Sequence, residues 1–199
     1  MPDYFALLDV PHRPWLDPDA LKQKFISLSA RVHPDKFHST GDAERALAEK
    51  KFAELNTACR CLTEPKSRLL HLLELESGAK PPEIQSIPAE LADLFAEVAM
   101  TCRQADAFLT EKAKVTSPLL QVQFFERGQA WVEKLSVLRQ KLDRMHEQLL
   151  DALKSLDEQW ANQDARHSLL RPLEELYRLF GYFNRWNSQI QERIVQLSF

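Results

Sequence analysis

The tripeptide His33-Pro34-Asp35 places an imidazole and a carboxylate on either side of a rigid ring, and Lys36 and Phe37 follow it. The Asp35 carboxylate can accept two parallel hydrogen bonds from an arginine, and the His33 ring can donate or accept one. Pro34 stiffens the backbone between them, because its ring fixes φ. No serine, cysteine or metal ligand accompanies the tripeptide at a useful spacing. This chemistry predicts a docking element and no catalytic residue.

Two amphipathic helices must hold this loop. Asp17-Pro18 is a helix start, with aspartate as the cap and proline at the first helical position. One apolar face then repeats at helical spacing: Leu21, Phe25, Leu28 and Val32. After the loop, a helix that begins beyond Ser39-Thr40-Gly41-Asp42 has a similar stripe: Ala48, Phe52, Leu55, Cys59 and Leu62. Since the two helices must pack antiparallel to bury these stripes, we expect the tip of the loop to project into solvent.

The rest of the chain is also predicted to be helical. A short apolar segment, Tyr4 to Leu8, precedes the loop helices, and a helical pattern resumes from Leu69 to Leu75 after Pro65. Three long helices follow. Their stripes are Leu91, Leu94, Phe95, Val98 and Cys102; Leu135, Leu138, Leu142, Met145 and Leu149; and Leu169, Leu173, Leu176, Phe180, Phe183, Asn187, Ile190, Ile194 and Leu197. Such helices bury their stripes as an antiparallel bundle.

The start of the last helix has two local signals. Ser155 followed by Glu158 has the spacing of a capping box, which predicts that the helix begins there. Pro172 would then kink the helix or mark its true first turn. The stripe alternates steps of four and three over four heptads, which is typical of a packed seam.

A segment rich in proline divides the chain. Residues 77–88 hold three of the eleven prolines and one of the four glycines, and they interrupt the helical periodicity on both sides. We therefore predict an all-α protein with a first domain at residues 1–76, a linker at 77–88 and a helical bundle at 89–199.

Composition excludes several classes of function. A net charge of −3 gives no basic excess for nucleic acid or an anionic membrane. No apolar run approaches the roughly 20 residues that span a bilayer, and the N-terminus shows no secretory signal. Cys59, Cys61 and Cys102 form no C-x-x-C pair, which argues against a zinc site. We expect a soluble, cytoplasmic protein with reduced thiols, no cofactor and no resident metal.

The loop and its frame resemble the J-domain of DnaJ-type co-chaperones. Asp3 to Val10 is similar to the first helix of that family, and Leu55-Asn56-Thr57-Ala58, with Leu62 and Pro65, is similar to its third-helix signature. The resemblance implies that the loop triggers ATP hydrolysis in a DnaK- or HscA-type chaperone. It also implies that basic residues before the loop meet an acidic surface of that ATPase. The residues expected to bind the chaperone are His33, Pro34, Asp35, Lys36, Lys22, Lys24 and Arg31.

One branch of the J-domain proteins, the HscB co-chaperones of iron–sulfur cluster assembly, resembles the chain further. Tyr4-Phe5 opens the domain, Phe37 follows the loop, and a Pro-x-x-Arg stretch leads to a leucine-rich segment: Pro65, Arg68, Leu72, Leu73, Leu75 and Gly78. Trp160 and the leucine-rich last helix are placed as in that family. The resemblance implies an L-shaped arrangement of a J-domain and a three-helix bundle.

The HscB family binds the scaffold protein IscU through its first long bundle helix. The matching positions here are Leu91, Leu94, Phe95 and Glu97, but Ala92, Ala96 and Ala99 stand where the family has its Met-Glu pair and spaced glutamates. Leu91 and Phe95 can equally be bundle core. Two alternatives stay open: a J-domain adaptor for another client, and a helical assembly protein with an inactive J-like domain. The co-chaperone reading predicts a monomer that is not itself an enzyme, and the assembly reading predicts an oligomer.

Overall fold

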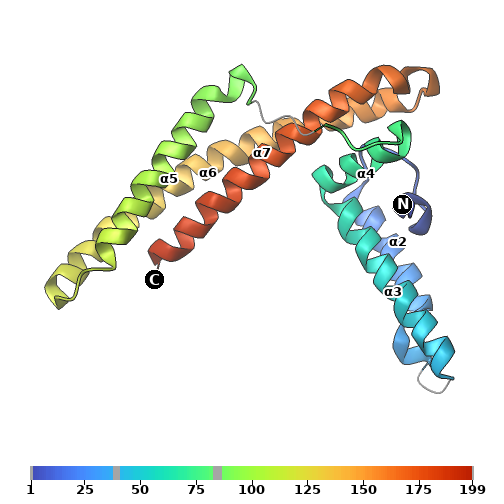
Figure 1. Ribbon diagram of the computed structural model, residues 1–199, viewed down its shortest axis with the longest axis horizontal. Coiled ribbons are helices and arrows are strands. Elements are labelled where there is room, and N and C mark those ends of the chain that lie inside the picture. Colours follow the sequence, from blue (N-terminus) through green and yellow to red (C-terminus); the bar gives the residue numbers. More distant parts are fainter. Residues whose placement is uncertain (1, 38–40, 83–86, 199) are drawn as a thin grey trace. The chain divides into compact units, whose positions relative to one another are not determined.

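The computed structural model describes residues 2–37, 41–82 and 87–198, apart from the side chains of Pro34 and Phe37. These described ranges contain helices and no strand, which confirms the all-α prediction (Figure 1). They also contain no helix that is both long enough and apolar enough to cross a membrane. The chain forms two compact units: unit 1 comprises Met1–Pro82 and Leu150–Arg178, and unit 2 comprises Glu83–Leu149 and Leu179–Phe199. The division into domains at residues 77–88 stays a prediction.

Four α-helices make up the described N-terminal part of unit 1, and capping side chains fix the starts of all but the third. They are α1 (Tyr4–Leu7), α2 (Pro18–Arg31), α3 (Asp42–Thr63) and α4 (Pro65–Ser77). The Asp17 carboxylate accepts a hydrogen bond from the Ala20 amide at 2.7 Å, and Pro18 opens α2, as predicted. The Glu64 carboxylate caps α4 by accepting from the amides of Lys66 and Ser67.

The apolar stripes of α2 and α3 face the interior of unit 1. Leu21 of α2 is buried, and so are Ala48, Leu55 and Leu62 of α3. Gly78 caps the end of helix α4, and its φ of 73° lies in the left-handed region that glycine adopts without strain. Among the described residues 78–82 and 87–88 no helix forms, in agreement with the predicted break.

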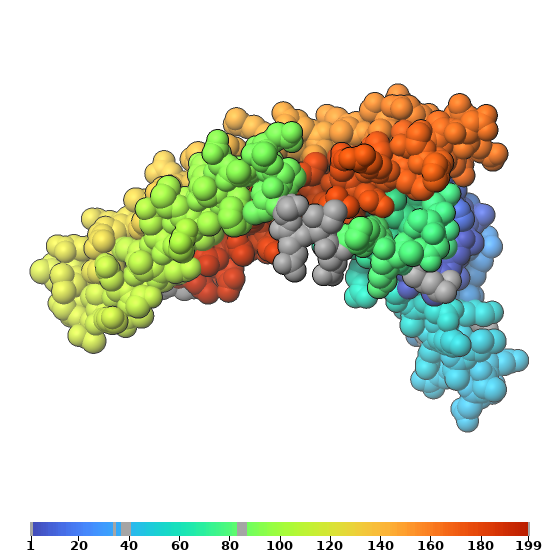
Figure 2. All heavy atoms as spheres, turned by 45° about the horizontal axis from the view of Figure 1, so that its top comes forward, coloured from blue at the N-terminus to red at the C-terminus, as the bar shows by residue number. Residues whose placement is uncertain are grey.

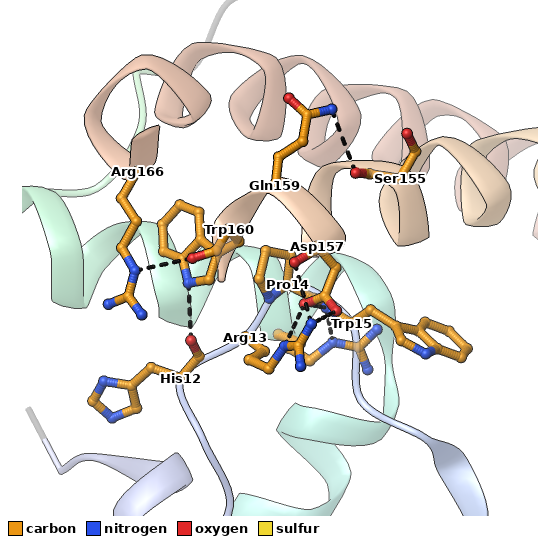
Figure 3. A network of polar contacts seen from close by, with 10 residues as sticks. His12, Arg13, Pro14, Trp15, Ser155, Asp157, Gln159, Trp160 and Arg166 are labelled. Atoms are coloured by element: carbon orange, nitrogen blue, oxygen red, sulfur yellow. Dashed lines mark hydrogen bonds and ion pairs between the residues drawn. The ribbon is translucent and has the colours of Figure 1, made fainter. Parts of the chain in front are cut away.

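A buried polar network joins the loop between α1 and α2 to the end of α6 (Pro118–Trp160), within unit 1 (Figure 3). The Asp157 carboxylate accepts hydrogen bonds from the Arg13 guanidinium, at 3.1 and 2.5 Å, and from the Trp15 amide at 3.0 Å. The Trp160 indole donates to the His12 carbonyl at 2.9 Å. Burial of Asp157 is possible because each of its oxygens has a donor.

Unit 2 packs three helices around one apolar core. These are α5 (Ala92–Lys112), α6 up to Leu149, and the part of α7 (Arg166–Ser198) that follows Leu179. The core includes most of the predicted stripes, together with Trp186: Leu94, Val98, Cys102, Leu135, Leu138, Leu142, Phe183, Ile190 and Leu197.

The predicted start of the last helix is wrong. Ser155 and Glu158 lie inside α6, which continues to Trp160, and the last helix begins only at Arg166. A short 3-10 turn, Gln163–Ala165, joins the two helices, and the Asn162 side chain caps it by accepting from the Asp164 amide. Pro172 lies inside α7 and is not in its first turn.

Candidate functional site

The predicted docking loop is a short turn at the end of the α2–α3 hairpin. Helix α2 ends at Arg31, because the residue before Pro34 is driven out of the helical region. Residues Pro34–Phe37 form a single 3-10 turn, in which the Lys36 amide donates to the His33 carbonyl at 3.0 Å. Residues 34–37 of the loop therefore have a regular backbone conformation.

His33 and Asp35, the two side chains of the loop that are predicted to dock, have different surroundings. The His33 ring packs edge-on against Phe52 of α3, with ring centroids 5.3 Å apart, and its Nδ1 accepts from the Asp35 amide at 3.3 Å. The Asp35 carboxylate is 85% exposed, and one of its oxygens lies 3.5 Å from His33 Nδ1. The ring is thus anchored to α3, whereas the carboxylate points to solvent. The Pro34 side chain lies outside the described part of the chain.

The predicted basic residues of α2 are exposed, but one of them already has a partner. The Lys24 ammonium forms an ion pair of 2.6 Å with Asp9, which follows α1. The hydrogen bond from Lys24 holds the pKa of Asp9 below its usual value. Lys22, Arg31 and Lys36 are exposed. Nothing in the sequence signalled the role of Asp9, because its contact with Lys24 depends on how α1 crosses the hairpin.

The predicted client residues separate into two pairs. Leu91 and Leu94 are 8% and 6% exposed and belong to the core of unit 2. Phe95 is 43% exposed, and its ring lies 6.3 Å from that of Trp186. The Glu97 carboxylate is also exposed and pairs with Lys141 of α6 at 2.6 Å. A partner that approaches α5 can therefore touch Phe95 and Glu97 but not the two leucines.

Cys61 and Cys102 lie in surroundings that disfavour the thiolate. All three cysteines are free thiols, and burial raises the pKa of Cys61 to about 11 and that of Cys102 above its usual value. A thiol with a raised pKa is a poor nucleophile and a poor metal ligand. Within the described ranges, no three His, Cys, Asp or Glu side chains come close enough to hold a metal ion.

Sequence comparison agrees with the geometry of the loop. Residues 3–71, which include the docking loop and its two helices, match the DnaJ domain family. This segment is a J-domain. Over 73 residues, the chain is 38% identical to the co-chaperone protein HscB homolog of Cupriavidus taiwanensis. That match covers 37% of this chain and 42% of the relative, so it spans less than half of either protein.

Solved structures extend the likeness to the whole fold. The chain is similar to chaperone HscB from Vibrio cholerae, with a TM-score of 0.61 and 21% identity over 98% of this chain and 99% of that one. It is also similar to the human co-chaperone protein HscB, with a TM-score of 0.62 and 21% identity over 96% and 81% of the two chains. The fold of the chain is therefore like that of the HscB structures, with a J-domain followed by a helical bundle.

Proposed function

We propose that this protein is a co-chaperone that stimulates ATP hydrolysis by an Hsp70-type chaperone of the DnaK or HscA kind. The observation that carries the proposal is the exposed Asp35 carboxylate beside an anchored His33, at the tip of a J-domain hairpin. A carboxylate held in this way can engage an arginine of the ATPase through two parallel hydrogen bonds. The protein supplies this contact and carries out no hydrolysis itself.

Exposed basic residues of α2 and of the loop support docking on an acidic surface. Lys22, Arg31 and Lys36 are exposed and supply positive charge on and beside the hairpin. Exposed charges of this kind mainly raise the rate of association and orient the partner. Lys24 contributes less, because its ammonium is already paired with Asp9.

In the second half of the proposal, the helical bundle delivers a client to the chaperone. That client is an IscU-like scaffold of iron–sulfur cluster assembly. Phe95 offers an apolar contact and Glu97 an acidic one on the exposed side of α5. Simultaneous binding of ATPase and client raises the local concentration of client at the chaperone. A monomer is sufficient for this mechanism, and the three free thiols suit a reducing compartment such as the cytoplasm.

Single-turnover ATP hydrolysis by DnaK- and HscA-type chaperones tests the first half. We expect the full chain to accelerate hydrolysis, Asp35→Asn to abolish the acceleration, and Asp164→Asn to leave it intact. Asp164 is a matched control, because it is also exposed but lies in the turn before α7, away from the loop. If no chaperone of either kind responds to the wild-type protein, the co-chaperone proposal fails.

The client is tested separately by titration of the protein with an IscU-type scaffold. We expect Phe95→Ser to weaken this binding while ATPase stimulation is unchanged. If the scaffold does not bind but hydrolysis is stimulated, the protein is a J-domain adaptor for another client. If hydrolysis is not stimulated and sedimentation shows an oligomer, the assembly reading is correct.

A further inference from the structure

The end of helix α1 has a backbone conformation that residues with a side chain rarely adopt. Asp9 has a φ of 51°, in the left-handed region, and it is the only non-glycine residue with a positive φ in the described part of the chain. Its amide donates to the Ala6 carbonyl at 3.1 Å, and the Val10 amide donates to the Phe5 carbonyl at 3.0 Å. This pair of hydrogen bonds is the Schellman motif, in which the left-handed residue is usually glycine.

The presence of an aspartate at this position calls for a reason other than the closure of α1. Glycine closes a helix in this way without strain, because a Cβ is disfavoured in the left-handed region. Aspartate tolerates the region better than most residues, but less well than glycine. Packing does not explain Asp9 either, because its side chain is 79% exposed. What remains is the contact that its carboxylate makes.

The Asp9 carboxylate accepts a hydrogen bond from the Lys24 ammonium of α2 at 2.6 Å. The same hydrogen bond lowers the pKa of Asp9, as expected for a contact that favours the charged carboxylate. Figure 2 shows the N-terminal segment, in dark blue, and α2, in lighter blue, at the surface of unit 1. The Lys24 side chain is 47% exposed. An ion pair between two such exposed groups is weak, so another carboxylate can displace it.

Lys24 lies on the side of α2 that leads to the docking loop. Arg31 follows Lys24 by seven residues, so the two cations lie on nearly the same side of the helix, about 10 Å apart along its axis. His33, the first residue of the predicted docking loop, comes two residues after Arg31. An acidic surface that docks along this side of α2 must therefore compete with Asp9 for Lys24.

The exposure of the pair sets the strength of this competition. An exposed ion pair changes an equilibrium by about two- to fivefold at low salt, and by less when salt screens the charges. Such a factor tunes the affinity of a weak docking contact without preventing it. It does not alter the contact proposed for Asp35, which is made by a different side chain at the tip of the loop.

We propose that Asp9 is an internal competitor for the acidic surface of the partner ATPase, and that its carboxylate sets the affinity of docking. In the free protein it holds Lys24, and in the complex a carboxylate of the ATPase takes its place. This inference rests on the proposed co-chaperone function, to which it adds a residue that determines affinity for the partner.

Two variants of the full-length chain test this role in the single-turnover ATPase assay. Asp9→Asn removes the charge and keeps a residue that tolerates the left-handed region, and Asp9→Gly removes the acceptor altogether. We expect both to reach half-maximal stimulation at a concentration about two- to fivefold lower than the wild type, at roughly 0.05 M salt. The maximal rate should be unchanged, and the gain should disappear at roughly 0.5 M salt.

Two controls separate this effect from a general change of charge. Asp19→Asn removes an exposed carboxylate from a different side of α2, and it should leave the half-maximal concentration unchanged. In a Lys24→Ala background, Asp9→Asn should have no effect, because the cation that Asp9 holds is then missing. Circular dichroism checks that every variant is folded.

Three results would overturn the proposal. The first is a wild type that stimulates hydrolysis with a half-maximal concentration that neither Asp9 variant lowers. The second is a higher half-maximal concentration in both variants, which would mean that the ion pair supports docking. The third is an equal gain in Asp19→Asn, or a gain that persists in the Lys24→Ala background. A wild type that stimulates no chaperone is a separate failure, because it refutes the proposed function and the competitor role together.

Discussion

The Asp157 carboxylate offers a direct test of how unit 1 is held together. It is 6% exposed, and Asp157→Ala would remove the acceptor for the Trp15 amide and the partner of the Arg13 guanidinium. An unpaired buried N–H costs about 1–2 kcal/mol, and a charge-assisted hydrogen bond contributes about 1.5–3 kcal/mol. The Arg13 side chain is 40% exposed and can regain water, which reduces the second value. We expect a loss of about 3 kcal/mol.

Asp157→Asn separates the two contributions. The asparagine oxygen can still accept from the Trp15 amide, but the charge that pairs with Arg13 is lost. We expect a loss about 1 kcal/mol smaller than for the alanine variant. Asp151→Ala is the matched control, because Asp151 is also an α6 residue of unit 1 but is 74% exposed and pairs with Lys154. Its effect should stay within about 0.5 kcal/mol.

The free energy of unfolding is measured in denaturant by circular dichroism. Hydrogen exchange of the Trp15 amide gives the free energy of the local opening that exposes this amide. The Trp15 amide should exchange faster in both Asp157 variants, and more so in the alanine variant. A loss below about 1 kcal/mol for Asp157→Ala would contradict the reasoning, because it would mean that water replaces the carboxylate without cost. Equal losses for alanine and asparagine would show that the Trp15 amide has no share in the stability.

Three further predictions concern single contacts. Burial lowers the pKa of His71, whose Nε2 accepts from the Tyr4 amide at 3.0 Å, so the folded protein binds fewer protons than the unfolded chain. Its contribution to stability is complete above pH 6.5, the ordinary histidine value, and is lost as the pH falls from there through the lower folded pKa. His71→Gln should flatten this part of a stability profile measured by denaturation from pH 4 to 8. Gly128→Ala should raise the free energy of unfolding by about 0.5–1 kcal/mol, because a Cβ there meets only ordinary contacts. The midpoint of thermal unfolding should rise accordingly; a lower midpoint would show that α6 and α7 cannot accommodate the methyl group. Lys24→Ala should raise the pKa of Asp9 towards its usual value, as followed by NMR titration, and an unchanged pKa would mean that the ion pair does not form in solution.

Capping residues predicted the start of a helix correctly where the cap itself fixes the first turn. Asp17 and Pro18 open α2 as the sequence indicated, because a capping carboxylate and a proline act only on their own turn. Ser155 and Glu158 have a comparable pattern, but they lie inside α6. A serine and a glutamate at this spacing are also tolerated inside a helix, and the packing of α6 along its whole length determines where that helix ends.

The spacing of apolar residues predicted the exposed loop, but it could not show which residues of an apolar stripe are buried and which are exposed. The His33 and Asp35 positions follow from two helices that must pack antiparallel. Leu94 and Phe95 are neighbours in one stripe, yet Leu94 is core and Phe95 is 43% exposed. The Phe95 ring lies near Trp186 of α7, more than 90 residues away in sequence, and the spacing within α5 carries no information about that neighbour. Such contacts leave no periodic signal.

The make-up of unit 1 has a consequence for biosynthesis. Its first segment ends at Pro82, and its second segment, with Asp157 and Trp160, is complete only at Arg178. At about 5–20 residues per second, a ribosome needs roughly 5–20 s to extend the chain from Pro82 to Arg178. For most of that time the loop containing Arg13 and Trp15 lacks its partners on α6, while the α2–α3 hairpin with the predicted docking loop has already been synthesised. The nascent chain can thus present the proposed docking loop before unit 1 has closed.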